Sequence, residues 1–365
     1  MPKKNEPLSI GGPPRLIAWE LTQSCNLRCI HCRASATEGR SGEELSTAEA
    51  ERFIDSLSEV GRPIIILTGG EPLMREDVFA LARKATESGL RVVLATNGTM
   101  IDSAIAREIV ASGIKRVSIS LDGPDASSHD NFRGISGAFD LAINGIEELK
   151  KAGMEFQINT TITKRNSHQI QAMADLAIRL GARALHIFLL VPTGRGKDLA
   201  NEAISAVEYE RVLHEFYDLS QLMPLEMKAT CAPHYYRIVS QKEKGKPAGS
   251  ISPHGSKHGL SAMTRGCLGG TGFCFISFKG DVCPCGYLPI VAGNIREQSF
   301  KQIWYNAPLF QDLRDLSKLK GKCGRCEYNM VCGGCRARAY NQKGDYLEEE
   351  PLCVYQPHGE KNAGK

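Results

Sequence analysis

The strongest constraint on the fold of this chain is a regular alternation of short apolar runs and amphipathic segments over residues 16–191. Six of these runs are nearly continuously apolar and rich in β-branched residues, as is typical of strands buried on both faces of a sheet. The runs occupy residues 16–21, 64–69, 91–96, 116–121, 156–162 and 184–191. Strands that alternate with helices predict a parallel sheet in an α/β fold.

The segments between the runs carry apolar residues at helical spacing, and a glycine follows most of them where a left-handed residue ends a helix. The predicted helices span residues 47–60, 76–88, 103–112, 138–152, 168–180 and 207–222. Six strand–helix repeats are too few to close an eight-stranded barrel. We therefore expect a partial (β/α)6 TIM-like barrel or an open α/β sheet, with the ligand site at the carboxyl ends of the strands.

The remaining composition divides the chain into regions of different character. We expect an N-terminal extension (1–15), the partial barrel (16–192), a bridging region (193–266), a cysteine-rich domain (267–353) and a tail (354–365). Residues 241–262 are polar and rich in Gly, Ser and Lys, which predicts a mobile loop. The cysteine-rich domain has few periodic runs, so we expect its fold to depend on bound metal.

Composition narrows the class of protein. With 45 Lys and Arg against 41 Asp and Glu, the net charge of +4 is too weak to predict a nucleic-acid-binding protein. No apolar run is long enough to span a membrane, and the N-terminal residues do not resemble a secretory signal. Thirteen cysteines are an odd number in a chain expected to lie in a reducing cytoplasm, so they predict metal sites in preference to disulfides.

The first three cysteines directly follow the first predicted strand, as Cys25, Cys29 and Cys32. Three thiolates in one loop at the carboxyl end of a sheet are typical of a [4Fe–4S] cluster that keeps one iron open for a small molecule. Zinc is the alternative, but a structural zinc site usually has four closed ligands, and the spacing of His31 does not match a zinc finger.

Polar residues and glycines follow other strands at the same predicted edge. Gly69, Gly70 and Glu71 end the second strand, where glycines allow close approach of the backbone to a ligand and a carboxylate can pair with an ammonium group. Ser120 and Asp122 end the fourth strand and are candidates to bind a ribose or a carboxylate. The alternative for Asp122 is a simple turn with the following Gly and Pro.

The C-terminal cysteines are dense enough to indicate metal binding. Cys323 and Cys326 are followed by Cys332, Cys335 and Cys353, and a zinc ribbon is the alternative to iron–sulfur ligation at such spacings. Adding Cys267, Cys274 and Cys285 makes eight cysteines, enough for two four-iron clusters. Cys231 and Cys283 are then surplus. Cys283 could replace Cys285, and Cys231 is either a buried free thiol or a contact to substrate or cluster.

The combination of C-x3-C-x2-C, GGEP and a partial barrel resembles the radical SAM superfamily over residues 16–191. The resemblance implies that Cys25, Cys29 and Cys32 bind a [4Fe–4S] cluster whose open iron holds S-adenosylmethionine (SAM). It also implies a role in SAM binding for Gly69, Gly70, Glu71, Ser120 and Asp122. Reductive cleavage of SAM would yield a 5′-deoxyadenosyl radical that abstracts hydrogen from the substrate, and we expect no catalytic residue beyond this radical-generating cluster.

The C-terminal segment resembles the SPASM (or twitch) auxiliary-cluster domain, which implies two further [4Fe–4S] clusters. The stretches GDVCPCG, GNIREQSFKQIW and CGRCEYNMVCGGC carry this resemblance. By position it assigns the first auxiliary cluster to Cys267, Cys274, Cys285 and Cys335. It assigns the second auxiliary cluster to Cys323, Cys326, Cys332 and Cys353.

Stretches along the whole chain, among them RLIAWELTQSCNLRCIHCRA and SISLDGPDASSHDNFRG, resemble the radical SAM haem b synthases of the sirohaem-dependent haem pathway. The resemblance implies an oxidative decarboxylase that converts two propionates of iron-coproporphyrin III to vinyl groups. A related tetrapyrrole enzyme (a didecarboxysirohaem deacetylase or a haem d1 side-chain enzyme) or a SPASM peptide maturase is the alternative. A non-enzymatic iron–sulfur carrier is disfavoured because it needs no open iron.

A tetracarboxylate substrate requires cations, and arginine can bind a carboxylate with two hydrogen bonds. The candidate substrate residues are Arg195, Lys197, His234, Tyr235, Arg237 and Arg265. On this hypothesis Arg195 contacts the porphyrin and is not needed for cleavage of SAM. The expected partners are the iron-porphyrin and a low-potential electron donor such as ferredoxin or flavodoxin, in the cytoplasm of an anaerobic organism.

Overall fold

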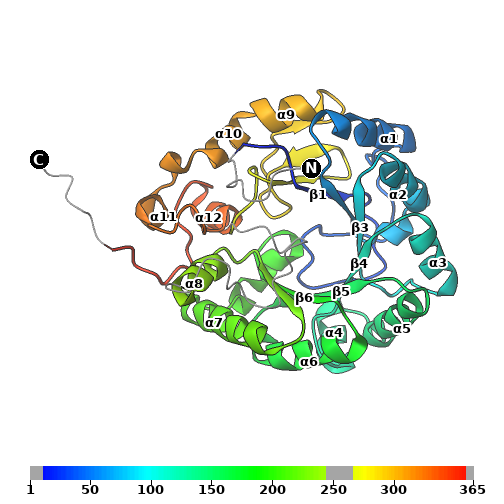
Figure 1. The fold of residues 1–365 in the computed structure, drawn as a ribbon, viewed down its shortest axis with the longest axis horizontal. Helices are drawn as coiled ribbons and strands as arrows, with labels where there is room; N and C mark the ends of the chain where they lie inside the picture. The colour runs from blue at the N-terminus through cyan, green and yellow to red at the C-terminus, as the bar shows by residue number, and fades with distance from the viewer. Residues whose placement is uncertain (1–10, 244–265, 359–365) are drawn as a thin grey trace, which may run out of the picture.

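The computed structural model describes residues 11–243 and 266–358 (Figure 1). Its first part contains β1 (Leu16–Glu20), α1 (Thr47–Ser56), β2 (Ile64–Thr68), α2 (Val78–Glu87), β3 (Arg91–Thr96), α3 (Ser103–Ala111), β4 (Arg116–Ser120), α4 (Ala126–Arg133), α5 (Ala138–Lys151), β5 (Phe156–Ile162), α6 (Ile170–Leu180) and β6 (Ala184–Leu189). It continues with α7 (Ala206–Leu222), β7 (Glu226–Thr230) and α8 (His234–Lys242). The cysteine-rich part contains β8 (Phe273–Ile276), β9 (Asp281–Cys283), β10 (Gly293–Asn294), α9 (Phe300–Asn306), α10 (Pro308–Arg314), α11 (Gly321–Arg325) and α12 (Arg336–Lys343).

The predicted α/β fold is confirmed. All six predicted strands begin at the residue expected, because their continuous apolar character identifies strands buried on both faces. The predicted helices are also present, although the segment beginning at residue 168 starts with a 3₁₀ turn before α6. None of the helices in the described ranges combines the length and the apolar character needed to cross a membrane. The predicted mobile loop lies almost entirely outside the described residues.

A single ten-stranded sheet runs through the molecule in the order β10-β9-β8-β1-β2-β3-β4-β5-β6-β7. Strands β1 to β7 are parallel to their neighbours, and β8 is parallel to β1. Figure 1 shows α1 to α8 around the outside of the strands, with α9 to α12 completing the ring. The partial barrel is therefore larger than six strands, because the bridging region adds β7 and the cysteine-rich domain adds β8.

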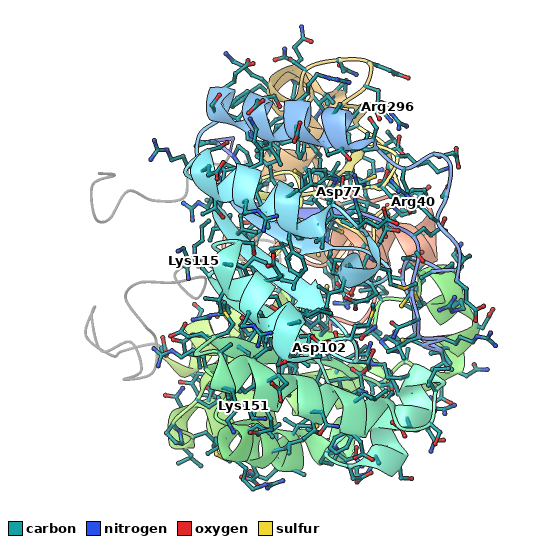
Figure 2. All side chains as sticks on the ribbon, turned by 90° about the vertical axis from the view of Figure 1, so that its right-hand side faces the viewer. Arg40, Asp77, Asp102, Lys115, Lys151 and Arg296 are labelled. Atoms are coloured by element: carbon teal, nitrogen blue, oxygen red, sulfur yellow. The ribbon has the colours of Figure 1, made fainter. Side chains whose placement is uncertain are left out.

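Aromatic packing joins the cysteine-rich domain to the first strand–helix unit. Trp19 of β1 packs edge-on against Phe53 of α1, with ring centroids 5.0 Å apart, and Phe53 packs edge-on against Phe300 of α9 at 5.6 Å. At the surface, Arg296 lies beside α1 (Figure 2) and pairs with Glu49 at 2.8 Å. Because buried aromatic rings contribute large apolar areas, these contacts hold the two regions as one body.

A close approach of α5 to the loop after β3 generates a prediction about stability. A Cβ atom on Gly145 would collide with the carbonyl oxygen of Gly98. Gly145→Ala should therefore introduce strain of about 1–3 kcal/mol, more than the ~1 kcal/mol that alanine gains in a helix. We expect a lower free energy of unfolding, measured by urea denaturation under anaerobic conditions.

Gly42→Ala is the matched control, because an added Cβ at Gly42 meets no atom within 4 Å and the residue is exposed. Its free energy of unfolding should stay within about 0.5 kcal/mol of the parent value. Equal stability of the two variants would contradict the proposed close packing of α5.

Candidate functional site

A cavity of about 460 Å³ lies inside the partial barrel and is lined by residues of every strand from β1 to β8. The three thiols of Cys25, Cys29 and Cys32 line this cavity, as do the thiols of Cys267, Cys285 and Cys335 from the cysteine-rich domain. A cavity of this size is in the range of small-molecule and cofactor sites. The cysteines that sequence analysis assigned to two different clusters therefore face one shared space.

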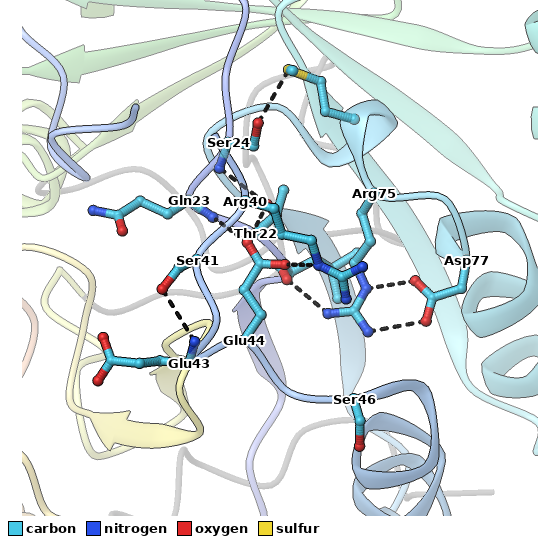
Figure 3. A network of polar contacts seen from close by, with 12 residues as sticks. Thr22, Gln23, Ser24, Arg40, Ser41, Glu43, Glu44, Ser46, Arg75 and Asp77 are labelled. Carbon is cyan, nitrogen blue, oxygen red and sulfur yellow. Dashed lines mark hydrogen bonds and ion pairs between the residues drawn. The ribbon is translucent and has the colours of Figure 1, made fainter. Parts of the chain in front are cut away.

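The loop that carries the first three cysteines is fixed at its base by a polar network centred on the buried carboxylate of Glu44 (Figure 3). Glu44 accepts hydrogen bonds from the hydroxyl of Thr22 (2.6 Å), the amide of Gln23 (3.2 Å) and Nε of Arg40 (2.8 Å). Arg75 donates to the carbonyl of Leu21 at 2.9 Å. These contacts orient the backbone just before Cys25, so the direction of the loop is set before the first thiol.

The glycines after β2 allow this loop to pack directly on the neighbouring strand end. The amide of Gly70 donates to the carbonyl of Thr22 (2.7 Å), and the amide of Glu71 donates to the carbonyl of Ser24 (2.7 Å). A Cβ on Gly70 would collide with the carbonyl of Ser24. Gly69 and Gly70 also line the cavity. Their lack of side chains thus serves the contact between two loops as well as the approach of a ligand.

The carboxylate of Glu71 is fully buried and is occupied by protein donors. Its oxygens accept from the hydroxyl of Thr96 (2.7 Å), the amide of Asn97 (2.8 Å) and the amide of Leu73 (3.1 Å). Burial raises the pKa of Glu71 despite these donors. The structure therefore shows Glu71 tying the ends of β2 and β3 together, and the side chain is not among those that line the cavity.

The two candidates at the end of β4 occupy different positions. Ser120 lines the cavity, whereas Asp122 is fully buried behind the wall. Asp122 pairs with Arg133 at 2.6 Å and accepts from the amide of Thr161 at 2.7 Å. Burial alone would raise the pKa of Asp122, but the charges of Arg133 and His31 hold it below its ordinary value. Asp122 is thus an anionic anchor for Arg133.

The guanidinium of Arg133, which is held by Asp122, also contacts the loop that carries the first three cysteines. Its Nη1 atom lies 3.6 Å from Sγ of Cys29, in a position to donate a hydrogen bond. Burial raises the pKa of Cys29, and the neighbouring guanidinium opposes that shift. Since metals bind the thiolate, a cation beside the sulfur favours the ligating form. The donor set and its apolar surroundings, which include Leu27 and Ala36, fit an iron–sulfur cluster.

The four cysteines assigned to the second auxiliary cluster, Cys323, Cys326, Cys332 and Cys353, surround one small cavity. His234 and Arg237 also line this small cavity and not the large one. His234 is fully buried, and neither ring nitrogen has a hydrogen-bond partner among the described residues. Arg237 is paired with Glu210 at 2.6 Å. Two of the predicted substrate residues thus lie at a cysteine site.

The other predicted substrate residues are distributed differently. Arg195 lines the large cavity, but its Nε donates to the carbonyl of Cys29 (3.0 Å) and its Nη1 to the carbonyl of Ala36 (2.7 Å). Lys197 is exposed and outside the cavity lining, and Tyr235 packs edge-on against Phe216. Arg265 lies outside the described residues.

Only three of the four cysteines assigned to the first auxiliary cluster lie at the large cavity. Cys267, Cys285 and Cys335 line the large cavity, and Cys274 does not. Cys274 is fully buried in β8. Cys231, which sequence analysis interpreted as either a buried free thiol or a contact to substrate or cluster, lines the large cavity at the end of β7. Burial raises the pKa of the Cys231 thiol, and the neighbouring thiols of Cys335, Cys285 and Cys267 add to the shift.

Sequence analysis missed several polar residues in the cavity wall. Lys228 of β7, His186 of β6 and Gln157 of β5 all line it, and Gln157 Nε2 lies 3.0 Å from Nδ1 of His186. Burial lowers the pKa of Lys228 to about 8 and that of His186 to about 3. Arg33 also lines the cavity and pairs with Glu20 at 2.7 Å. Their positions could have been predicted from the alternation of polar and apolar residues within the strands, since alternate residues of a strand point to the same face of the sheet.

Comparison with known families agrees with this geometry. The model of the radical SAM superfamily matches residues 19–177, and that of SPASM, an iron–sulfur cluster-binding domain, matches residues 267–336. The chain belongs to the radical SAM superfamily and carries a SPASM domain. It is therefore an enzyme that uses SAM and iron–sulfur clusters, and the alternatives of a zinc protein and a passive electron carrier are wrong.

Within the superfamily, the resemblance to haem synthases is confirmed. The chain is 55% identical over 350 residues to the AdoMet-dependent heme synthase of Methanosarcina barkeri, covering 96% of this chain and 99% of that one. It is 54% identical over 351 residues to the enzyme of the same name from Nitratidesulfovibrio vulgaris, covering 96% and 95%. Streptococcus suis SuiB bound to its precursor peptide SuiA shares the fold, with a TM-score of 0.75 at 18% identity over 94% of this chain and 76% of that chain.

The contacts of Arg195 predict an effect on the radical-generating cluster. Arg195→Ala removes two charged donors from loop carbonyls, at a cost of about 1.5–3 kcal/mol each. Uncoupled cleavage of SAM, followed by release of 5′-deoxyadenosine without porphyrin present, should fall by about tenfold or more. Arg83→Ala is the control, because that exposed arginine of α2 pairs with Glu108 of α3. Unchanged SAM cleavage in Arg195→Ala would restore the original hypothesis that Arg195 serves only the substrate.

Proposed function

We propose that this enzyme converts two propionate side chains of iron-coproporphyrin III into vinyl groups and so forms haem b. The observation that carries the proposal is one large cavity, which the proposed SAM-site cysteines and the proposed auxiliary-site cysteines line together. The identity of 54–55% to two heme synthases over 96% of the chain supports the same substrate class. The proposal includes three [4Fe–4S] clusters, for which the eleven assigned cysteines supply enough thiols.

The cavity suits a flat apolar molecule with charged edges. Apolar residues of the strands make up much of its wall. The guanidinium carbon of Arg33 lies 4.4 Å from the ring centroid of Phe275 in β8. Lys228 lies in the same wall. An apolar pocket with a few cations recognises a carboxylate-bearing ring by burying the ring and pairing the carboxylates. We therefore infer that Lys228 and Arg33 face propionate groups.

When bound, SAM and its reduced cluster supply a 5′-deoxyadenosyl radical that takes a hydrogen atom from the β-carbon of a propionate. The surrounding strands exclude water, which protects a reactive carbon radical from side reactions. Loss of CO2 leaves one electron to be removed for each vinyl group, so each propionate consumes one SAM. The auxiliary cysteines in the cavity wall would hold a cluster, and such a cluster could accept this electron.

The proposed function also includes a reducing compartment for the enzyme. The proposed clusters need reduced cysteines, and none of the thirteen, all of which lie in the described ranges, forms a disulfide. We infer a cytoplasmic enzyme of an anaerobic organism, reduced by a low-potential donor of the ferredoxin or flavodoxin type.

The reaction is tested by incubating the reduced, anaerobic enzyme with SAM and iron-coproporphyrin III. We expect a monovinyl intermediate followed by haem b, with about two 5′-deoxyadenosines released per haem, because each decarboxylation needs one radical. Chromatography with mass spectrometry follows both products. Turnover of didecarboxysirohaem or of a peptide in place of iron-coproporphyrin III would overturn the proposed reaction and support one of the alternatives.

The buried position of Lys228 predicts a specific effect on substrate affinity. Lys228→Met keeps the length of the side chain and removes its charge, so the dissociation constant for iron-coproporphyrin III should rise about tenfold or more. Burial lowers the pKa of Lys228 to about 8, and the charged form exists below that pKa. Affinity of the parent enzyme should therefore decline as the pH rises above about 8, and affinity of Lys228→Met should not show this decline.

Porphyrin titration monitored by absorbance measures both effects. Lys197→Met is the matched control, because Lys197 is exposed and lies outside the cavity lining. It should bind the porphyrin as the parent does. Equal loss of affinity in the two lysine variants would show that general charge, and not a carboxylate contact inside the cavity, governs binding.

A further inference from the structure

The three cysteines of the first auxiliary set that line the large cavity, Cys267, Cys285 and Cys335, lack a fourth partner in the position assigned by sequence. Cys274 occupies the middle of β8, where its neighbours Phe273 and Phe275 both line the cavity. Because side chains alternate between the two faces of a strand, Cys274 points to the opposite face.

The surroundings of Cys274 agree with this orientation. The residue belongs to the main apolar core together with Trp304 and Phe310, and burial raises the pKa of its thiol. Bringing Cys274 to the cavity would require β8 to slip by one residue against β1, which would also turn Phe273 and Phe275 out of the cavity.

Cys231, and not Cys274, lines the large cavity together with the other three cysteines. It follows the last residue of β7, lines the same cavity as Cys267, Cys285 and Cys335, and packs in one small apolar cluster with Cys285 and Cys335. Four cysteines thus line one cavity, three from the cysteine-rich domain and one from the barrel.

The backbone at Cys231 is held in an unusual conformation. Its φ is +56°, and among the described residues only Ser35 shares a positive φ without being glycine. The carbonyl of Cys231 accepts hydrogen bonds from the hydroxyl of Tyr209 (3.2 Å) and from Nη2 of Arg338 (2.8 Å). A strained backbone held by two donors indicates a side chain that must point in a particular direction.

We propose that Cys231 is the fourth thiolate ligand of the first auxiliary cluster, together with Cys267, Cys285 and Cys335, and that Cys274 is a buried free thiol. The proposal rests on the auxiliary cluster included in the proposed function, but not on the reaction. It makes this cluster a covalent link between the last barrel strand and the SPASM domain. It also places the cluster three residues from Lys228 along the chain.

The test uses the full-length chain with Cys25, Cys29 and Cys32 replaced by alanine, so that only auxiliary clusters remain. After anaerobic reconstitution this parent should contain about eight irons per chain, counted chemically and by Mössbauer spectroscopy. Into it we introduce Cys231→Ala, Cys231→Ser and Cys274→Ala separately. A parent with no iron would refute the proposed cluster count, which is a failure distinct from that of the ligand assignment.

The expected result is that Cys231→Ala loses about one to four irons while Cys274→Ala keeps the parent content. Cys231→Ser should retain a four-iron cluster with an altered Mössbauer spectrum, because an alkoxide oxygen replaces one sulfur. Circular dichroism and the signal of the second auxiliary cluster show that each variant is folded. The assignment is overturned if Cys274→Ala loses the cluster, or if Cys231→Ala and Cys231→Ser leave iron content and spectrum unchanged. Loss of both clusters in Cys231→Ala with an unchanged Cys231→Ser spectrum also overturns it.

Discussion

The double pairing of β1 is the constraint on which the rest of the molecule depends. β1 is hydrogen-bonded in parallel to β2 on one side and to β8 on the other, so the cysteine-rich domain extends the barrel sheet instead of sitting beside it. The loop that follows β1 carries the first three cysteines, and β8 and β9 lead to Cys285. One strand therefore brings two cysteine sets, far apart in sequence, to the same cavity.

Buried ion pairs then fix the cysteines within that arrangement. Arg338 pairs with Glu350 at 2.9 Å, Glu350 accepts from the amide of Cys335 at 2.6 Å, and Arg338 donates to the carbonyl of Cys231. Asp122 and Arg133 form the corresponding pair beside Cys29. Each pair is costly to desolvate, and the loss of one partner would leave an uncompensated buried charge at a cost of about 3–5 kcal/mol. Each ion pair also hydrogen-bonds to a cysteine. The free energy spent on burying the two charges therefore fixes the position of the thiols.

Sequence reasoning succeeded where the signal is local. The strands of the barrel could be predicted because runs such as residues 91–96 are apolar on both faces, and the loop with Cys25 could be predicted from spacing alone. β7 was missed because it lies at the edge of the sheet and carries Glu226 and Lys228, so it is not a continuously apolar run. Arg195 was interpreted as a substrate residue because its contact with Cys29 spans 166 residues, which no local pattern reveals.

The sequence by itself determined the order of the first six strands, the cysteine spacings and the edge of the sheet where the chemistry lies. These properties follow from periodicity and from short loops, which depend only on near neighbours in the chain. Only the tertiary structure decided that Glu71 and Asp122 are buried anchors and that His234 lies at the small cavity lined by four C-terminal cysteines. It also decided that Cys231 faces the large cavity while Cys274 is buried in the apolar core. The physical reason is that side-chain direction and distant packing are set by how strands twist and pair, so residues equivalent in composition differ in what they face.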